Sequence, residues 1–387
     1  MNTLGETSSG AIAPDFTLPR LLRYFLSLGT VGFGGPIALA GYMQRDLVEK
    51  RKWITPEEYV EGLALAQLAP GPLAAQLAMY LGYVRSGVLG ATLVGFTFIG
   101  PSFVMVLAIA AAYVRFGGLP WMQALFYGIG AAVIGIIARS AWKLVRVTVG
   151  KDPLRWIIFL VLAISTAVTE REIIWLFLCG GILSLLMKAF PRELLKPSLP
   201  MLALVLPGIG TLAPGGLAEV FLFFAKAGLF VFGSGLAIVP FLHGGIVIER
   251  HWLTERQFVD AVAVAMITPG PVVITVAFIG FLVAGIWGGV AAALGVFLPV
   301  YLIIILLGPY YRRFAKNPQL HAFVSGVTVA ATGAIAGAVI VLARRSIHDA
   351  TTAIIAGATL LALSRWKIPE PLLIAAAGAV GILLYHS

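Results

Sequence analysis

The chain of 387 residues is 60% hydrophobic and only 11% charged, with a mean hydropathy of +0.98. This composition excludes an ordinary soluble globular domain and predicts a membrane protein. The formal net charge is +10, but Lys and Arg gather in the loops between apolar runs, where they signal topology rather than nucleic-acid binding. The single cysteine, Cys179, excludes an intrachain disulfide and a thiolate-rich metal site.

The chain begins with a short polar stretch and then alternates between apolar runs and loops. Its first fifteen residues are polar and small and lack the pattern of a secretion signal, so we expect residues 1–16 to be a cytoplasmic tail. Several of the apolar runs are shorter than the roughly 20 residues that a crossing helix needs. The runs are 18–45, 57–84, 88–114, 120–145, 154–168, 172–187, 198–213, 217–248, 256–284, 286–311, 320–343, 349–364 and 369–386.

Two of these runs carry Pro-Gly-Pro at their centre, at 70–72 and at 269–271. Proline removes a backbone donor and clashes with the preceding turn, so a helix must break at each motif. Either two half-helices meet there, or the segment folds back as a re-entrant hairpin. The basic loops before and after the first motif fall on one side of the membrane only if the segment folds back, so the charges favour the hairpin.

The two motifs belong to a longer repeat. Their interval, 270 minus 71, is 199 residues, and it also places Phe33-Gly34-Gly35-Pro36 onto Phe232-Gly233-Ser234-Gly235. It places Arg51-x-Trp53-x-Thr55 onto Arg250-x-Trp252-x-Thr254 as well. The sequence therefore predicts a duplicated membrane unit. We expect a first repeat over 17–188, a linker over 189–216 with a span that inverts the topology, and a second repeat over 217–387.

The distribution of basic residues predicts that the second repeat is inverted relative to the first. The loop at 43–57, the region 139–155 and the linker at 188–197 are basic and should face the cytoplasm. An uncharged span at 198–213 then crosses the membrane, so that the second repeat starts on the opposite side and has inverted topology. The predicted fold class is an all-α polytopic membrane protein with two inverted-topology repeats and discontinuous helices or re-entrant hairpins.

The helix breaks are the predicted substrate site. Backbone groups left unpaired at membrane depth need protein, water or a ligand, and the half-helix after each break points its N-terminal N–H groups at an anion. The alternative is that the breaks are only kinks, because Gly and Pro are common in membrane helices. The candidate substrate-binding residues are Ser27, Gly34, Gly35, Pro36, Gln67, Pro70, Gly71, Pro72, Gln76, Lys226, Gly233, Ser234, Gly235, Thr268, Pro269, Gly270, Pro271 and Thr275.

Three of the ionisable residues inside the apolar runs are candidates for a role in transport. Lys226 precedes the second glycine break and could attract an oxyanion, or it could snorkel to the membrane surface. Glu61 and Asp260 each lie nine residues before a Pro-Gly-Pro motif and are candidates for proton coupling. Alternatively, both acids sit at the membrane surface near a helix N-terminus.

The sequence contains no P-loop, catalytic triad or metal-ligand cluster. It therefore predicts a protein that is not an enzyme and that needs no cofactor or metal. The lipid bilayer is the expected environment and nucleic acid is not an expected partner. A homodimer is one open alternative for the oligomeric state.

The motifs resemble those of a known transporter family. The run from Phe25 to Pro36, followed by Arg51-Lys-Trp-Ile-Thr55 and by Ala64-Leu-Ala-Gln-Leu-Ala-Pro-Gly-Pro72, is similar to the long-chain members of the chromate ion transporter family. The resemblance covers nearly the whole chain. It implies a multi-pass protein of the bacterial inner membrane, with antiparallel homologous halves, that exports chromate and confers chromate resistance.

The resemblance leaves substrate and symmetry open. A transporter or channel for sulfate or another oxyanion is the alternative, because sulfate has the same shape and charge as chromate. The second repeat departs from the first, with Gly235 in place of Pro36 and Met266 in place of Gln67. Equal roles for the two copies are therefore not expected.

Overall fold

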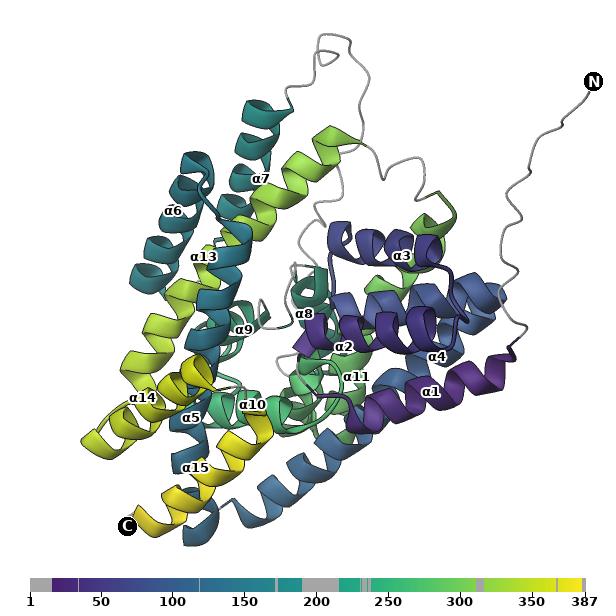
Figure 1. Cartoon of the computed structure of the whole chain (residues 1–387). Helices are drawn as coiled ribbons and strands as arrows, with labels where there is room; N and C mark the ends of the chain where they lie inside the picture. Colours follow the sequence, from purple (N-terminus) through teal and green to yellow (C-terminus); the bar gives the residue numbers. More distant parts are fainter. Residues whose placement is uncertain are drawn as a thin grey trace, which may run out of the picture.

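A computed structural model describes residues 16–33, 35–117, 119–170, 173–189, 216–229, 231, 235, 238–310, 317–366 and 368–384. Within these ranges every regular element is a helix, as the sequence predicts (Figure 1). The first half contributes α1 (Leu18–Val31), α2 (Gly35–Met43), the π-helix η1 (Gln44–Lys50), α3 (Pro56–Leu68), α4 (Leu73–Phe116), α5 (Pro120–Thr148), α6 (Pro153–Thr169) and α7 (Ile174–Lys188).

The second half repeats this order closely. The N-terminal tail 1–15 and the predicted inverting span at 198–213 lie outside the described residues. The second half contributes α8 (Leu217–Leu229), α9 (Ile238–Leu242), the π-helix η3 (His243–Glu249), α10 (Glu255–Ile267), the 3₁₀ turn η4 (Val272–Ile274), α11 (Thr275–Leu307), the 3₁₀ turn η5 (Gly308–Tyr310), α13 (Pro318–Ser346), α14 (Ala350–Arg365) and α15 (Glu370–Leu384).

Local backbone features recur at the predicted interval. Each π-helix is followed by one residue with positive φ, Lys52 at 53° and His251 at 52°, and then by a tryptophan. A capping box starts α3 at Thr55 and α10 at Thr254, and its side chain satisfies a helix N–H that would otherwise be unpaired. The duplicated sequence therefore forms duplicated local structure.

The chain folds back at each Pro-Gly-Pro, as the charge distribution predicted. In the first half a Cβ added at Gly62 of α3 would lie 2.3 Å from the Tyr80 ring of α4. In the second half the Thr275 hydroxyl donates to the Ala261 carbonyl of α10 at 2.8 Å. At about 1.5 Å per residue, the 13 residues of α3 span about 20 Å, too short for the roughly 30 Å hydrocarbon core. Each motif joins a short helix to a longer one in a hairpin.

Both long helices of these hairpins reverse direction a second time. Ser86 and Gly87 in α4 leave the helical region, with Gly87 at φ 59°, and Ala284 and Gly285 in α11 do the same, with Gly285 at φ 62°. The reversal brings Gly90 so close to Gly82 that an added Cβ would lie 2.0 Å from the Gly82 carbonyl oxygen. These positions match the boundaries at 84–88 and 284–286 that separate the predicted apolar runs.

Each half packs one 29-residue helix, α5 or α13, against helices of the other half. α5 of the first half packs on α14 and α15 of the second, and α13 of the second half packs on α6 and α7 of the first (Figure 1). Glycines permit the close approach: a Cβ at Gly128 would lie 2.0 Å from the Ala377 carbonyl, and one at Gly326 would lie 2.4 Å from the Gly180 carbonyl. We call these six helices the paired-helix layer.

The helices α5 and α13 run antiparallel where they meet. Near the start of α5, the Tyr127 hydroxyl donates to Asp349, just beyond the end of α13, at 2.6 Å. At the end of α5, Thr148 lies 3.1 Å from Thr332 in the middle of α13, hydroxyl to hydroxyl. As residue numbers increase along α5, the numbers of the contacted residues decrease along α13, so the two helices are antiparallel.

Four described helices, 73–116, 120–148, 272–310 and 318–346, are long and apolar enough to cross a membrane. Large apolar side chains are exposed along them, including Phe96, Val104 and Leu306. Such an apolar outer surface suits lipid rather than water. The first and third of these helices contain the reversals described above, so their full length is not one straight crossing.

Candidate functional site

The two Pro-Gly-Pro loops each bind the broken helix of the other half. The Gly270 N–H donates to the Gly32 carbonyl, just past the end of α1, at 2.8 Å. The Gly71 N–H donates to the Val231 carbonyl, just past the end of α8, at 2.7 Å. Gly32 and Val231 differ by 199 residues, so the two hydrogen bonds are reciprocal. Reciprocal contacts of this kind define an approximate two-fold relation between the halves.

Each loop glycine is also pressed against a long helix of the other half. Gly270 has φ 97°, and an added Cβ would lie 1.9 Å from Oγ of Ser102 in α4. Gly71 has φ 134°, and an added Cβ would lie 2.7 Å from a Val300 methyl group in α11. Positive φ and the lack of space both require glycine at these two positions. We call the helices that meet at these loops, α1 to α4 and α8 to α11, the loop core.

Two of the predicted polar residues brace the hairpins. Gln76 and Thr275 are equivalent in the repeat; Nε2 of Gln76 donates to the Pro70 carbonyl at 2.8 Å, and Thr275 donates to Ala261. Both side chains are fully buried or nearly so. These hydrogen-bond donors therefore stabilise the loops. The Gln76 Oε1 has no hydrogen-bond partner among the described residues.

A cavity of about 320 Å³ opens beside the second loop. We call it the loop cavity. Gly35, which begins α2, and Val272, which begins η4, both line it, so two helix N-termini reach its wall. Thr268 and Gly270 line it from the Pro-Gly-Pro loop, and Glu370 of α15 is the acidic residue among its described lining groups. Peptide N–H groups at such a wall can bind an anion.

A larger cavity of about 940 Å³ lies next to the loop cavity. The two share Phe33, Tyr42 and Pro369 as lining residues. We call it the arginine cavity, because its charged lining residues are Arg20, Arg23, Arg45, Arg51 and Asp46.

The sequence interpretation missed this cavity. The sequence pattern indicates Arg45 as part of a basic loop and Arg51 as part of that loop and of the repeated motif, and it assigns no role to Arg20 and Arg23. The spacing of Arg20, Arg23 and Ser27 does place them on one helix face, which is the signal that could have found them. Ser27, a predicted site residue, lines the arginine cavity.

The other predicted site residues fall into separate places. Gly235 is buried, and a Cβ there would lie 3.7 Å from Pro36 and 3.5 Å from Val272, so the second helix break meets the first beside η4. Gln67 and Lys226 are exposed, and neither lines a cavity described above. Pro72, Pro269 and Pro271 are buried within the loops and Pro70 is half-buried. Gly34, Gly233 and Ser234 lie outside the described residues.

The two predicted proton-coupling acids differ in burial. Asp260 is only 2% exposed and accepts a hydrogen bond from the Tyr113 hydroxyl at 2.7 Å. Glu61 is half-buried and accepts from the Tyr80 hydroxyl at 3.3 Å. Asp260 also lines a cavity of about 230 Å³ between α5, α10 and α13, together with Glu255 and Arg345. Of the two acids, Asp260 is therefore the one enclosed within the protein.

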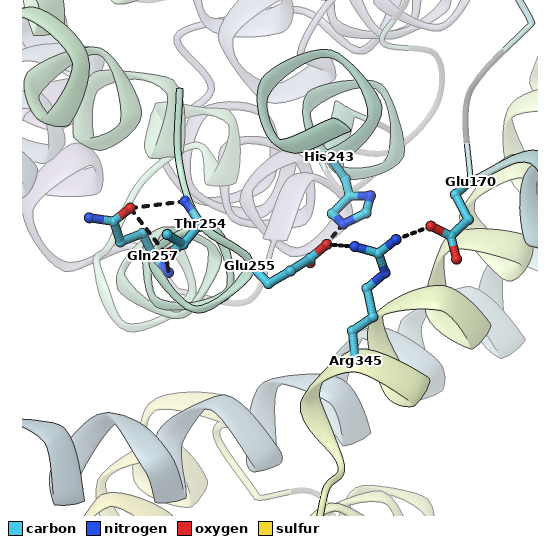
Figure 2. Close-up of polar contacts among 6 residues, drawn as sticks. All are labelled: Glu170, His243, Thr254, Glu255, Gln257 and Arg345. Atoms are coloured by element: carbon cyan, nitrogen blue, oxygen red, sulfur yellow. Dashed lines mark hydrogen bonds and ion pairs between the residues drawn. The ribbon is translucent and has the colours of Figure 1, made fainter. Parts of the chain in front are cut away.

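Two residues that line this third cavity, Glu255 and Arg345, belong to a row of linked charged groups (Figure 2). Arg345, near the end of α13, contacts Glu255 at the start of α10 and Glu170 at the end of α6. Glu255 also lies 2.8 Å from Nε2 of the buried His243. Burial alone would raise the pKa of Glu255, but His243 and Arg345 hold that pKa below its ordinary value. These ionic contacts join the loop core to the paired-helix layer.

We expect Arg345→Gln to destabilise the protein, because Glu255 and Glu170 would lose their shared cation. The pairs are about one-third exposed, so the expected loss is about 1–2 kcal/mol, between that of an exposed and a buried pair. Thermal unfolding in detergent measures it as a lower Tm. Arg344→Gln is the matched control, since Arg344 is exposed and forms no ion pair with a described residue.

The stabilisation by this ion pair should depend on pH in a defined direction. Because the pKa of Glu255 is lower in the folded protein, its stabilisation is complete above its ordinary value of 4.5 and is lost as the pH falls through the folded value. The Tm difference between wild type and Arg345→Gln should shrink over that range. An equal Tm at neutral pH would contradict the assignment.

The fold and cavities define a class: a multi-pass helical membrane protein in which two interlocked halves enclose cavities lined by helix N-termini and arginines. The family-wide sequence pattern described as "Chromate transporter" matches residues 19–185 and 218–382, one match in each half. The chain belongs to this family.

Relatives of known name cover nearly the whole chain. The "Chromate transport protein" of Cupriavidus metallidurans is 58% identical over 98% of this chain and 96% of its own length. The "Probable chromate transport protein" of Synechococcus elongatus is 54% identical over 97% of each chain. The "Chromate transport protein" of Pseudomonas aeruginosa is 30% identical over 98% of this chain and 95% of its own. No solved structure matches the chain.

Proposed function

We propose that the chain is a secondary transporter of the bacterial inner membrane that exports chromate and thereby confers chromate resistance. The family and the names of the relatives support chromate as the substrate. The observation that carries the mechanism is the reciprocal pair of hydrogen bonds by which the Pro-Gly-Pro loop of each half holds the helix break of the other. A site made from both halves changes when one half moves against the other.

The dianion binds in the loop cavity in this proposal. The N-terminal N–H groups of α2 at Gly35 and of η4 at Val272 supply positive potential without a full charge. The Thr268 side chain adds a polar group, although its hydroxyl already donates to Val264 at 3.0 Å. Weak and distributed binding of this kind suits a carrier, which must also release its substrate.

Alternating access follows from the arrangement of the halves. The antiparallel contact of α5 with α13 supports two repeats of inverted topology, with the Pro-Gly-Pro hairpins re-entering the membrane from opposite sides. Rocking of one repeat against the other would open the loop cavity to one side and then to the other. Lys226, if it contributes, acts from the exposed face of α8.

The membrane potential favours export. Moving a charge across 100 mV is worth about 2.3 kcal/mol, so expelling a dianion from an inside-negative cell gains about twice that. Uptake of labelled chromate into inverted membrane vesicles, under an imposed potential and with sulfate as competitor, tests the proposal. We expect potential-driven uptake that a Gly270→Ala variant lacks. Uptake of sulfate with no uptake of chromate would instead identify a sulfate transporter.

Proton coupling through Asp260 is a separate prediction. Asp260 is enclosed, hydrogen-bonded to Tyr113 and in contact with a cavity that contains other ionisable groups. We expect Asp260→Asn to remove the response of chromate flux to an imposed pH gradient while leaving potential-driven flux. Glu61→Gln, the same change at the equivalent position, is the control and should keep that response. A normal pH response in Asp260→Asn would exclude this residue from coupling.

A further inference from the structure

The arginine cavity has an excess of positive charge that the described residues do not neutralise. Its charged lining residues are four arginines and one aspartate. Asp46 is already engaged, because it pairs with Arg45 at 3.1 Å and with Lys50 at 3.5 Å. Arg20 and Arg23 are exposed in the cavity wall and form no ion pair with a described residue. The wall as a whole therefore attracts anions.

The cavity also contains an unsatisfied donor. Tyr24 lines it and is only 8% exposed, and the Tyr24 hydroxyl is buried with no hydrogen-bond partner in the described part of the chain. Leaving a buried hydroxyl unpaired costs free energy, so an acceptor that reached it would be bound favourably.

The neighbouring guanidinium is held in place by aromatic rings. Arg51 lies 4.7 Å from the centre of the Trp53 ring and 5.2 Å from that of Tyr24. Trp53 in turn stacks on Phe16, with ring centres 5.0 Å apart. A guanidinium fixed in this way loses little conformational freedom when it binds a second group. Planar arginine forks match the oxygen pairs of tetrahedral oxyanions.

The second half does not repeat this arrangement. Glu219, Leu222 and Phe223 stand at the positions equivalent to Arg20, Arg23 and Tyr24, and Gly244 stands at that of Arg45. Arg250, the equivalent of Arg51, is neutralised by Glu219 at 3.2 Å and lies 4.6 Å from the centre of the Phe223 ring. The second half thus keeps the sequence repeat but lacks the equivalent arginines and tyrosine, so the charged residues of the arginine cavity come from the first half.

We propose that the arginine cavity is a capture site for the divalent tetrahedral oxyanion, which passes from it into the loop cavity. This inference rests on the proposed function and deepens it. The two cavities share the walls formed by Phe33, Tyr42 and Pro369. The basic loop at 43–57, which supplies Arg45 and Arg51, is predicted to face the cytoplasm. A capture site on the cytoplasmic side would lower the KM for the exported anion, while the membrane potential drives export.

The double variant Arg20→Gln/Arg23→Gln tests the capture site. We expect the KM for chromate to rise about tenfold in inverted vesicles, which present the cytoplasmic face, with Vmax within about twofold of wild type. Increasing the salt concentration should raise the wild-type KM and reduce the difference, because screening weakens the attraction. Both arginines are exposed, so folding should be unaffected and an unchanged Tm verifies this.

The controls separate this inference from the proposed function. Arg146→Gln removes a charge from an exposed position on α5 that lines none of the described cavities, and its KM should equal that of wild type. Tyr24→Phe, which removes the unpaired hydroxyl, should weaken chromate binding to the purified protein in calorimetry by about threefold to tenfold. Normal transport by wild type together with an unchanged KM in the double variant would overturn the capture site alone. Wild type that does not transport chromate would overturn the proposed function.

Discussion

Gly270→Ala should abolish chromate transport. The added methyl group would lie 1.9 Å from Oγ of Ser102, and the backbone at φ 97° is one that alanine rarely adopts. Strained backbone alone costs about 1–3 kcal/mol, and the overlap must also displace the loop from α4. The displacement would break the hydrogen bond from Gly270 to Gly32. We expect transport in vesicles to fall at least about tenfold, since more than about 1.4 kcal/mol is lost.

Two further variants show whether geometry is the cause. Gly41→Ala in α2 is the control, because a Cβ there meets nothing within 4 Å, and its transport should be normal. Adding Ser102→Gly to Gly270→Ala removes the two atoms that the methyl group would strike, at 1.9 and 3.1 Å. We expect this double variant to recover part of the activity and to stay below wild type because the backbone strain persists. Full activity in Gly270→Ala would contradict the role of the loop.

Gly90→Ala should prevent the protein from folding. Its added methyl group would lie 2.0 Å from the backbone oxygen of Gly82, across the reversal at Ser86 and Gly87. Backbone atoms on both sides cannot give way as a side chain can, so the two helical parts of α4 must separate. Separation would also move the helix that holds Phe98 against Gly29 of α1. We expect little monodisperse protein after purification and a much lower Tm in what remains.

The matched control lies on the same helix. Gly100 is helical and a Cβ there meets nothing within 4 Å, so Gly100→Ala should purify and melt like wild type. Gly288→Ala tests the equivalent reversal in the second half, where the Cβ would lie 2.1 Å from the Gly280 oxygen. The two reversal variants should fail alike. A well-folded Gly90→Ala protein would show that the two parts of α4 are not packed as described.

Much of the fold could be predicted because its signals are local. The Pro-Gly-Pro motifs at 70–72 and 269–271 and the glycines near 86 and 285 favour helix breaks, so these interruptions could be predicted from the sequence. The duplication is visible in the interval alone. The packing of α5 and α13 against helices of the other half was not predictable in this way. Glycines such as Gly128 and Gly326 indicate close helix packing, but they do not show which helix is the neighbour.

The candidate site was only partly predictable, for a different physical reason. The type of a residue does not show which groups its side chain bonds to. Gln76 and Thr275 were expected to contact the substrate, but their side chains donate hydrogen bonds within the hairpins. Charges near a loop satisfy a topology rule and can serve a cavity as well, so Arg45 and Arg51 were interpreted too narrowly. Ser102 lies far from every motif in the sequence and reaches Gly270 only through the fold.

Counterflow of labelled chromate in proteoliposomes that contain only this protein tests the central claim most directly. A carrier whose site lies between two interlocked halves must show saturable flux, and unlabelled chromate on one side must drive transient accumulation of label from the other. We predict both for wild type and Gly41→Ala, and neither for Gly270→Ala. Flux that rises linearly with concentration and shows no counterflow, or counterflow that survives Gly270→Ala, would contradict the account.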